Sequence, residues 1–385
     1  MPAAGPTSVA VRPTACYLRL TVLDLLTRAL ALAVGLALVA AALRSAIRTF
    51  VLPRGVPDPL PRAVFLAVRA LFDLRTRRAR DYAERDRLMA MFAPVSLLLL
   101  VAVYIFLAIL GYTALFWALG VDSWRTAFAI SGSSMLTLGF ATVEDLGKTV
   151  VVFTEATIGL TLIALVISYL PTMYSAFSRR ENAVTTLEVR AGSPPSAVEL
   201  IKRYHRIHGF GRLNELWAQW EVWFADVEET HTSFGALSFF RSPQPEHSWV
   251  TAAGAVLDAA ALVNAAVDTP HDPQADLCIR AGYLCFRHIC DFFYIPYEPD
   301  PKPDDPISVA RFEFEAACDE MAAAGVVLKP DRDAAWRAFN GWRVNYDRPL
   351  LSLAALTMAP LAPWSSDRSL RVRSHFRPSA AVPRG

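Results

Sequence analysis

The sequence predicts an all-α membrane protein in which spanning helices and a re-entrant loop are followed by an α-helical cytoplasmic domain. Hydrophobic residues make up 54% of the 385 residues and charged residues 19%. The apolar residues gather into long runs near the start of the chain, which is typical of membrane spans. Farther along they recur at helical spacing, while strand-like alternation and a glycine-rich phosphate loop are missing. We therefore expect a membrane part followed by a helical soluble part.

The N-terminal segment, residues 1–93, is expected to hold a first membrane helix and a basic cytoplasmic loop. Its apolar run at residues 30–43 is flanked by arginines, and helical extension to about residues 22–47 gives the roughly 20 residues that a span needs. A signal peptide is the alternative. However, the leader is long and contains Asp24, and no strong cleavage signature follows the run.

Two later runs predict spans more strongly. Residues 94–119 contain no charged residue, and residues 150–172 contain a single one, Glu155. The second run is followed by the basic pair Arg179 and Arg180. Both runs are long and apolar enough to cross a bilayer as helices. We expect an outer helix at the first run and an inner helix at the second.

The arginine distribution predicts the orientation of these spans. Between residues 44 and 93 there are eleven Arg and no Lys against five acidic residues, whereas residues 120–149 hold two basic and three acidic residues. Short loops rich in basic residues stay on the cytoplasmic side. We therefore expect a multi-pass protein of the cell membrane, with the chain after Tyr174 in the cytoplasm.

The segment between the two strong spans does not resemble an ordinary polar loop. Residues 124–135 can form a helix of about three turns, which is too short to cross a bilayer. The sequence Thr-Leu-Gly-Phe-Ala follows at residues 137–141, and then come Glu144 and Asp145. Non-helical backbone is tolerated at membrane depth only where protein buries it or where it lines a watery path. This pattern predicts a loop that enters the membrane and returns.

Residues 94–180 resemble the pore module of potassium channels and their relatives, with an outer helix, a short pore helix, a filter and an inner helix. The filter of that family reads Thr-Val-Gly-Tyr-Gly, and its carbonyl oxygens replace the water around the ion. Thr137, Leu138, Gly139 and Phe140 match its first four positions. The resemblance implies a permeant monovalent cation, with potassium as the leading candidate, and no cofactor. It also implies a homotetramer, because four loops surround one ion.

The fifth filter position departs from the family pattern. Ala141 stands where the family has its second glycine, and Thr142 stands where an aspartate commonly follows. Glycine suits that position because alternate residues need left-handed backbone angles, which a Cβ disfavours. Two interpretations stay open: a potassium-selective filter, and a filter with an altered outer site that passes several monovalent cations.

Five further residues are candidates for gating or for the outer mouth. Gly159 and Pro171 lie where an inner helix can bend to form a gate, although close packing and an ordinary helix end explain them equally simply. Glu144, Asp145 and Glu155 can concentrate cations at an outer mouth. The alternatives are a solvated loop for the first two, and for Glu155 a bond to the back of the re-entrant loop.

The cytoplasmic domain is expected to cover residues 181–364, with a disordered tail at residues 365–385. Residues 191–196 form a linker rich in turn residues. After it, apolar residues follow one face of a helix at residues 210–227. The residues of this face are Leu213, Leu216, Trp217, Trp220, Phe224 and Val227. Further helices are expected at residues 248–267, 276–294, 307–325 and 332–346, and a packing helix at 349–364.

Several function classes find no support in the sequence. A net charge of +2 and the lack of a basic tract interleaved with aromatic residues argue against nucleic acid. Cys278, Cys285, His288 and Cys290 lie close together, but their spacing fits no common zinc pattern, so we expect no metal site. No catalytic constellation can be assembled, and we do not expect an enzyme.

The leading hypothesis is therefore an ion channel subunit in the lipid bilayer. We expect an unidentified signal or regulatory ligand to open it through the cytoplasmic helical domain. The alternative is a membrane-anchored helical sensor or scaffold whose re-entrant loop does not conduct. Recording of cation flux separates the two.

Overall fold

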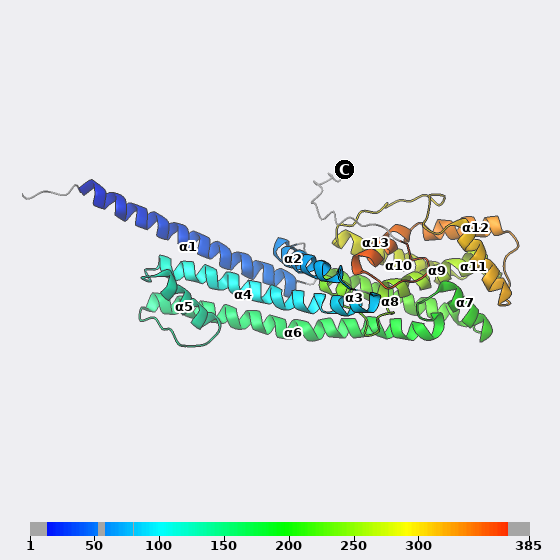
Figure 1. The fold of residues 1–385 in the computed structure, drawn as a ribbon, viewed down its shortest axis with the longest axis horizontal. Coiled ribbons are helices and arrows are strands. Elements are labelled where there is room, and N and C mark those ends of the chain that lie inside the picture. Colours follow the sequence, from blue (N-terminus) through cyan, green and yellow to red (C-terminus); the bar gives the residue numbers. More distant parts are fainter. Residues whose placement is uncertain (1–13, 53–57, 80, 369–385) are drawn as a thin grey trace, which may run out of the picture. The chain divides into compact units, whose positions relative to one another are not determined.

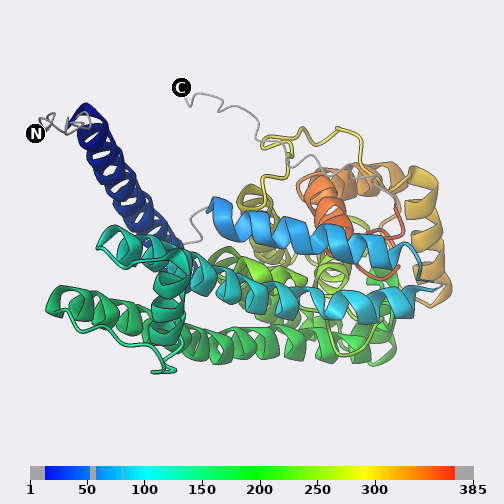
Figure 2. The same ribbon diagram turned by 60° about the vertical axis from the view of Figure 1, so that its left-hand side comes forward.

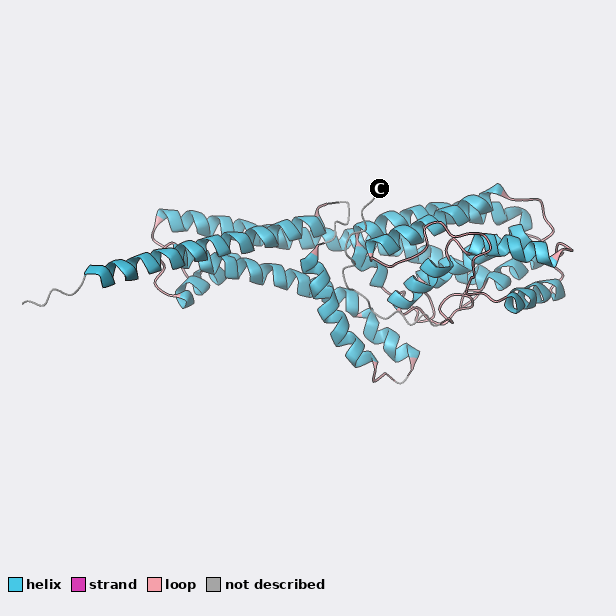
Figure 3. Ribbon diagram, turned by 90° about the horizontal axis from the view of Figure 1, so that it is seen from above, coloured by secondary structure: helices cyan, strands magenta, loops and turns pink. Residues whose placement is uncertain are grey.

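The structure is a computed structural model of the chain, and it describes residues 14–52, 58–79 and 81–368, with side chains from residue 23 onward. Its secondary structure is helical (Figures 1 and 3). The described residues contain no strand, and the single pairing of sheet type is an isolated bridge between Val267 and Leu328. The prediction of an all-α fold is confirmed.

The helices follow the chain in a simple order (Figure 1). They are α1 (Thr14–Phe50), α2 (Pro59–Thr76), α3 (Tyr82–Ala90), α4 (Phe92–Ala118), α5 (Trp124–Met135), α6 (Leu146–Ala191), α7 (Ala197–Arg206), α8 (Leu213–Ser233), α9 (Trp249–Ala266), α10 (Pro273–Phe292), α11 (Arg311–Ala323), α12 (Arg332–Arg343) and α13 (Asp347–Thr357), with the 3₁₀ turns η1 (Phe210–Arg212) and η2 (Gly235–Phe239).

The chain divides into two compact units, and their boundaries differ from the expected domains. Unit one contains the described part of Met1–Val51 together with Leu98–Ser168. Unit two contains Leu52–Leu97 and the chain from Tyr169 onward. The boundary of the C-terminal domain therefore lies within α6 rather than at residue 180. The segment expected to be a basic loop folds as α2 and α3 and belongs to unit two.

Among the described residues, four helical segments are long and apolar enough to cross a membrane. They are Leu23–Phe50, Tyr82–Ala118, Leu146–Ala191 and Trp249–Ala266. The first three match the three runs that the sequence suggested as spans, except that the second segment ends one residue earlier, at Ala118. The fourth is α9, and 94% of its apolar stretch is buried inside the protein. Its apolar composition is thus accounted for by its place in the core of unit two.

Within unit one, α1 packs against α4 through small residues. A Cβ on Gly35 would lie 2.7 Å from the carbonyl oxygen of Gly111, so the two backbones approach as closely as glycine allows. Farther along the same pair of helices, the hydroxyls of Ser45 and Thr49 each lie 3.0 Å from the hydroxyl of Tyr104. The first apolar run is thus an integral part of unit one.

Helix α6 is much longer than the expected inner helix, which was to end at residue 172. It continues through Pro171 to Ala191. A proline inside a helix removes one backbone hydrogen bond, which packing on either side can offset. The following turns bury Met173 and Ala176 and the side chain of Arg180 in unit two, and these contacts stabilise the continuation.

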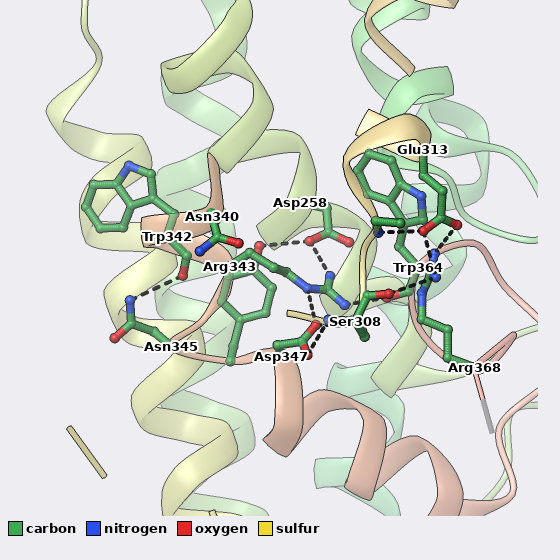
Figure 4. A network of polar contacts seen from close by, with 12 residues as sticks. Asp258, Ser308, Glu313, Asn340, Trp342, Arg343, Asn345, Asp347, Trp364 and Arg368 are labelled. Carbon is green, nitrogen blue, oxygen red and sulfur yellow. Dashed lines mark hydrogen bonds and ion pairs between the residues drawn. The ribbon is translucent and has the colours of Figure 1, made fainter. Parts of the chain in front are cut away.

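The core of unit two surrounds α9. The predicted apolar face of α8 is confirmed, because its six residues are all buried. Arg343 of α12 is also fully buried and forms the centre of a polar network (Figure 4). Its guanidinium donates to Asp258 at 2.5 Å and to Asp347 at 2.8 Å, and Tyr346 donates to Asp258 at 2.8 Å. Because each buried charge has an opposite charge beside it, this network fixes α9, α12 and α13 together.

Helices α2 and α3 were not anticipated, although both carry clear capping residues. Asp58 accepts a hydrogen bond from the amide of Leu60, and Asp81 accepts one from the amide of Glu84. Arg241 then attaches α3 to the rest of unit two by donating to Asp86 at 2.5 Å. The same guanidinium donates to the carbonyl oxygens at the end of α13.

The C-terminal tail begins later than expected. Ser365 is 1% exposed, and Arg368 pairs with Glu313 of α11 at 2.8 Å, so residues 365–368 pack on unit two. A tail predicted from composition alone missed these contacts. The rest of the predicted tail, residues 369–385, lies outside the described residues.

Candidate functional site

The short helix α5 has the bounds expected from the sequence, and it lies between α4 and α6 (Figure 2). Ser123 begins it by accepting a hydrogen bond from the amide of Thr126 at 3.1 Å. Trp124, the first helical residue, stacks on Trp117 of α4 with ring centroids 5.0 Å apart. At 12 residues, α5 is about 18 Å long, which is less than the thickness of a bilayer core.

The C-terminus of α5 turns sharply at Thr137. The amide of Leu138 donates to the carbonyl of Ser133 at 2.8 Å, and the amide of Thr137 donates to that of Ser134 at 3.0 Å. This pair of bonds is a Schellman motif, which places one residue in the left-handed region and usually uses glycine there. Here the residue is Thr137, with a φ of 55°. A β-branched residue in this conformation is strained.

Residues 137–141 continue with a second left-handed residue. Gly139 has a φ of 71°, so alternate residues of the segment have positive φ. Ala141 does not continue the alternation, since it is not among the residues with positive φ. Instead, its amide donates to the hydroxyl of Ser133 at 3.1 Å. Backbone with alternating handedness can turn successive carbonyl groups toward the same side, as a filter requires.

The two large apolar side chains of this segment are not covered by their own chain. Leu138 is 61% exposed and Phe140 is 67% exposed. Large apolar side chains at such exposure are typical of a surface that binds a partner, and none of the described residues covers them. The segment is thus held to α5 by its backbone, with Thr137, Leu138 and Phe140 exposed and Ala141 packed against the apolar cluster of unit one.

Three serines of α5 hold the helix and the segment in place. Ser133 accepts from Ala141, as described above. Ser134 donates to the carbonyl of Val152 in α6 at 2.9 Å. Ser131 donates to Ile109 of α4 at 3.1 Å and lies 2.5 Å from Glu155 of α6. Short polar side chains stabilise close helix packing in apolar surroundings by bonding across helices. Sequence reasoning did not single out these serines, although their run in residues 131–134 is the available signal.

Glu155 is fully buried in the chain, and its Oε1 accepts the hydrogen bond from Ser131. Its other oxygen, Oε2, is buried without a hydrogen-bond partner. Of the two interpretations that the sequence left open, this contact agrees with the bond from Glu155 to the segment between the two strong spans, since Ser131 belongs to α5. A role for Glu155 at an outer mouth stays a prediction.

Gly159 lies where α5 ends against α6. A Cβ at this position would meet the carbonyl oxygen of Met135 at 2.5 Å, so only glycine fits without a shift. This close approach gives the residue a packing role, and its gating role stays a prediction. Pro171 is exposed inside α6, in the part of the helix that belongs to unit two. Its effect on gating likewise stays a prediction.

The two acidic residues after the segment differ in their surroundings. Asp145 lies at the start of α6, where its Oδ2 accepts from the amide of Lys148 at 3.0 Å. It therefore caps the helix, and its negative charge at the positive end of the helix dipole stabilises the helix. Glu144 is exposed. The contribution of either carboxylate to an outer mouth stays a prediction.

The polar groups that this segment presents are mainly those of the backbone. It offers carbonyl oxygens of residues 137–141 and the hydroxyl of Thr137, which are hard ligands suited to alkali metal ions. The described residues include no group of three His, Cys, Asp or Glu side chains placed to hold a metal ion. Cys278, Cys285 and Cys290 are buried free thiols, and burial raises the pKa of Cys285 well above its ordinary value.

Comparison with known proteins adds no further information about the site. The chain matches no protein-family model, no curated protein and no solved structure.

Proposed function

We propose that the chain is a subunit of a channel that conducts monovalent cations, with potassium as the leading candidate ion. The observation that carries the proposal is the segment of residues 137–141. Two alternate residues there have left-handed backbone, while Leu138 and Phe140 are exposed in the single chain. Such a segment suits a lining that several copies complete around an ion. The potassium-channel-like order of helices supports the same proposal.

The proposal places the protein in the lipid bilayer as a multi-pass protein of the cell membrane. Three apolar helical segments, contained in α1, α3–α4 and α6, support membrane insertion. The arginine-rich stretch between residues 44 and 93 supports a cytoplasmic location for α2 and α3 and hence for the C-terminal domain. A homotetramer follows from the proposal, because one loop supplies one wall of a filter.

The ion selectivity of the proposed channel depends on Ala141. Its backbone does not adopt the left-handed conformation that the second glycine of a potassium filter allows. An outer site that differs from the family pattern suits a channel that passes sodium as well as potassium. Selectivity for potassium alone would require the carbonyl groups of Thr137 to Gly139 to discriminate between potassium and sodium without the outer site.

The C-terminal domain is the proposed place where an unidentified signal acts. Helix α6 supports this because it runs without interruption from Leu146 to Ala191 and contributes to both units. A continuous helix that begins beside the proposed filter and ends in the C-terminal domain can transmit a displacement between them. No ligand is proposed for this step.

Cation flux from purified protein in liposomes tests the proposed function. We expect potassium flux from the natural chain and its loss when Gly139 is changed to Val, because Val disfavours a φ of 71°. Gly132→Ala is the control, since no atom lies within 4 Å of an added Cβ there. Absence of flux at every voltage, pH and calcium concentration tested would instead favour the membrane-anchored sensor or scaffold.

A further inference from the structure

Helix α2 has two faces, and only one of them is covered by the protein. Val64, Val68 and Phe72 are buried at helical spacing, and Phe72 packs edge-on against Phe92 with centroids 5.8 Å apart. The opposite face is also apolar but exposed. It consists of Ala63, Leu66, Ala67, Ala70, Leu71 and Leu74. We call these six residues the outer face of α2.

The outer face is too apolar to be an ordinary solvated helix surface. Leu66 is 38% exposed, Leu71 51% and Leu74 56%. Residues at this three- and four-residue spacing form one continuous stripe. An exposed apolar stripe of this kind marks a binding surface. The helix nevertheless does not qualify as a membrane span, because charged residues such as Arg69 and Asp73 occur along it.

Basic residues extend the outer face at its C-terminal end. Arg75, Arg77 and Arg78 are all exposed. The acidic residue nearest to them in α2, Asp73, is already paired with Arg69 at 2.9 Å. The end of the helix therefore presents positive charge that its own acidic residue does not neutralise. An apolar stripe with adjoining arginines is the pattern of a helix that lies in the surface of an anionic membrane.

The chain connections keep α2 near a bilayer. It begins nine residues after the end of α1 at Phe50, and nine residues of extended chain span at most about 30 Å. On its other side only α3 separates it from α4, which begins at Phe92. Both α1 and α4 lie in proposed spans. Because α2 lies between two proposed spans in the sequence, a bilayer surface is the partner that the proposed function places closest to it.

The segments of the chain outside the described residues do not suit the outer face as occupants. Residues 1–13, 53–57, 80 and 369–385 contain seven Arg and no Asp or Glu. Positive segments are repelled by the arginines at the end of α2. We therefore propose that the outer face of α2 binds the surface of a bilayer containing anionic lipid, with its leucines in the acyl boundary and its arginines at the headgroups. This inference rests on the membrane location within the proposed function and adds a lipid-binding surface to it.

Fluorescence quenching in vesicles tests this inference on the full chain. Cys16 is changed to Ser, and a bimane label is placed at Leu71→Cys. The remaining natural cysteines are buried. Val222→Cys on α8 provides a matched label, because Val222 is an aliphatic residue 71% exposed. Vesicles of phosphatidylcholine are compared with vesicles containing phosphatidylglycerol, using brominated acyl chains and aqueous iodide as quenchers.

We expect brominated lipid to quench the label at residue 71 at least about twofold more than the label at residue 222, with the opposite order for iodide. The quenching by brominated lipid is expected to be stronger with phosphatidylglycerol, and R75Q/R77Q/R78Q is expected to remove that increase. Equal iodide quenching at the two sites overturns the inference. Protection of residue 71 from both quenchers also overturns it, in favour of a second protein chain.

Flux recorded from the same vesicles separates this inference from the proposed function. Conduction with a water-exposed label at residue 71 contradicts the lipid-binding surface alone. A lipid-quenched label without conduction contradicts the channel and supports the surface. Quenching that does not depend on phosphatidylglycerol overturns the part of the inference that concerns anionic lipid.

Discussion

Thr137 shows how a single residue can carry the properties of the proposed filter. It occupies the position in a Schellman motif that glycine usually takes, and its φ of 55° is unfavourable for a β-branched side chain. Strain of this kind persists where the surrounding structure enforces it, and it clusters at functional sites. The hydroxyl of Thr137 is the one side-chain ligand that the proposed filter contains.

Replacing Thr137 with Gly separates stability from function. We expect the free energy of unfolding to rise by roughly 1 kcal/mol, because glycine adopts the left-handed conformation without strain. Ion discrimination is expected to fall because the hydroxyl is lost. Thermal unfolding in detergent and flux ratios for potassium and sodium measure the two effects. Thr142→Gly is the control, since Thr142 lacks a positive φ and should not gain stability. A less stable T137G would contradict the assigned strain.

Glu155 is expected to position α5 through its contact with Ser131. Glu155→Gln keeps a side-chain oxygen that can accept from Ser131, so stability and flux should stay close to those of the natural chain. Glu155→Ala removes the acceptor and is expected to lower the free energy of unfolding by about 1–3 kcal/mol. Ion selectivity is also measured in E155A that remains folded. A changed selectivity indicates that Glu155 positions α5, whereas an unchanged selectivity indicates that its loss only weakens the fold. Loss of flux in E155Q with unchanged stability would instead indicate that the carboxyl group itself interacts with ions.

At the level of helices, the contact between α5 and α6 depends on a glycine. We expect Gly159→Ala to lower the free energy of unfolding by about 1–3 kcal/mol, because the added methyl group meets the Met135 carbonyl. Gly132→Ala in α5 is expected to be neutral or to stabilise the helix by up to about 1 kcal/mol. Thermal unfolding of both variants tests the packing role. An unchanged stability with an altered open probability in G159A would support the bending role that the sequence suggested.

Helix α6 is attached to α8 by a contact between Arg180 and His231. His231 of α8 is fully buried, and its Nε2 lies 3.1 Å from Arg180 of α6. Its Nδ1 lies 2.9 Å from the carbonyl of Val227, which assigns the proton to Nδ1 and leaves Nε2 to accept from Arg180. Burial lowers the pKa of His231 well below its ordinary value, and Arg180 lowers this pKa further.

Because folding lowers the pKa of His231, we expect the free energy of unfolding to fall as the pH falls. Above a pH of about 6.5 the histidine is neutral in both states, and its contribution to stability is complete. As the pH falls below that value, the unfolded chain binds a proton that the folded chain does not bind. Stability should therefore decline by about 1.4 kcal/mol per pH unit until the folded-state pKa is reached.

Unfolding temperatures between pH 7.5 and pH 5 measure this decline. We expect His231→Gln to flatten it. An equally steep decline in H231Q would show that other groups cause the acid sensitivity.

For the whole molecule, the proposed function requires more than one chain. Besides Leu138 and Phe140, large apolar side chains of α6 are exposed in the single chain, including Phe153 at 65% and Ile167 at 66%. Lipid can cover part of such a surface. Neighbouring copies are needed to surround an ion path.

Oligomeric mass is the measurement at this scale. We expect native mass spectrometry and chemical cross-linking in mild detergent to give a species of four chains. Heating in sodium dodecyl sulfate should convert this species to single chains. Only monomers under mild conditions would contradict the tetramer and, with it, the proposed filter.

The sequence by itself determined the helical class, the apolar segments and the short helix at residues 124–135, because these depend on local composition and spacing. It also determined the buried face of α8, since one helical period brings those residues together. It did not reveal α2 and α3, because their arginines obscure an amphipathic pattern, although Asp58 and Asp81 signal both starts.

Only the tertiary structure decided which distant residues meet. The contacts of Glu155 with Ser131, of Gly159 with Met135 and of Arg180 with His231 join helices that are separated along the chain. Local spacing carries no information about such pairs. The left-handed backbone at Thr137 likewise results from the way α5 ends, which residue preference alone would assign to a glycine.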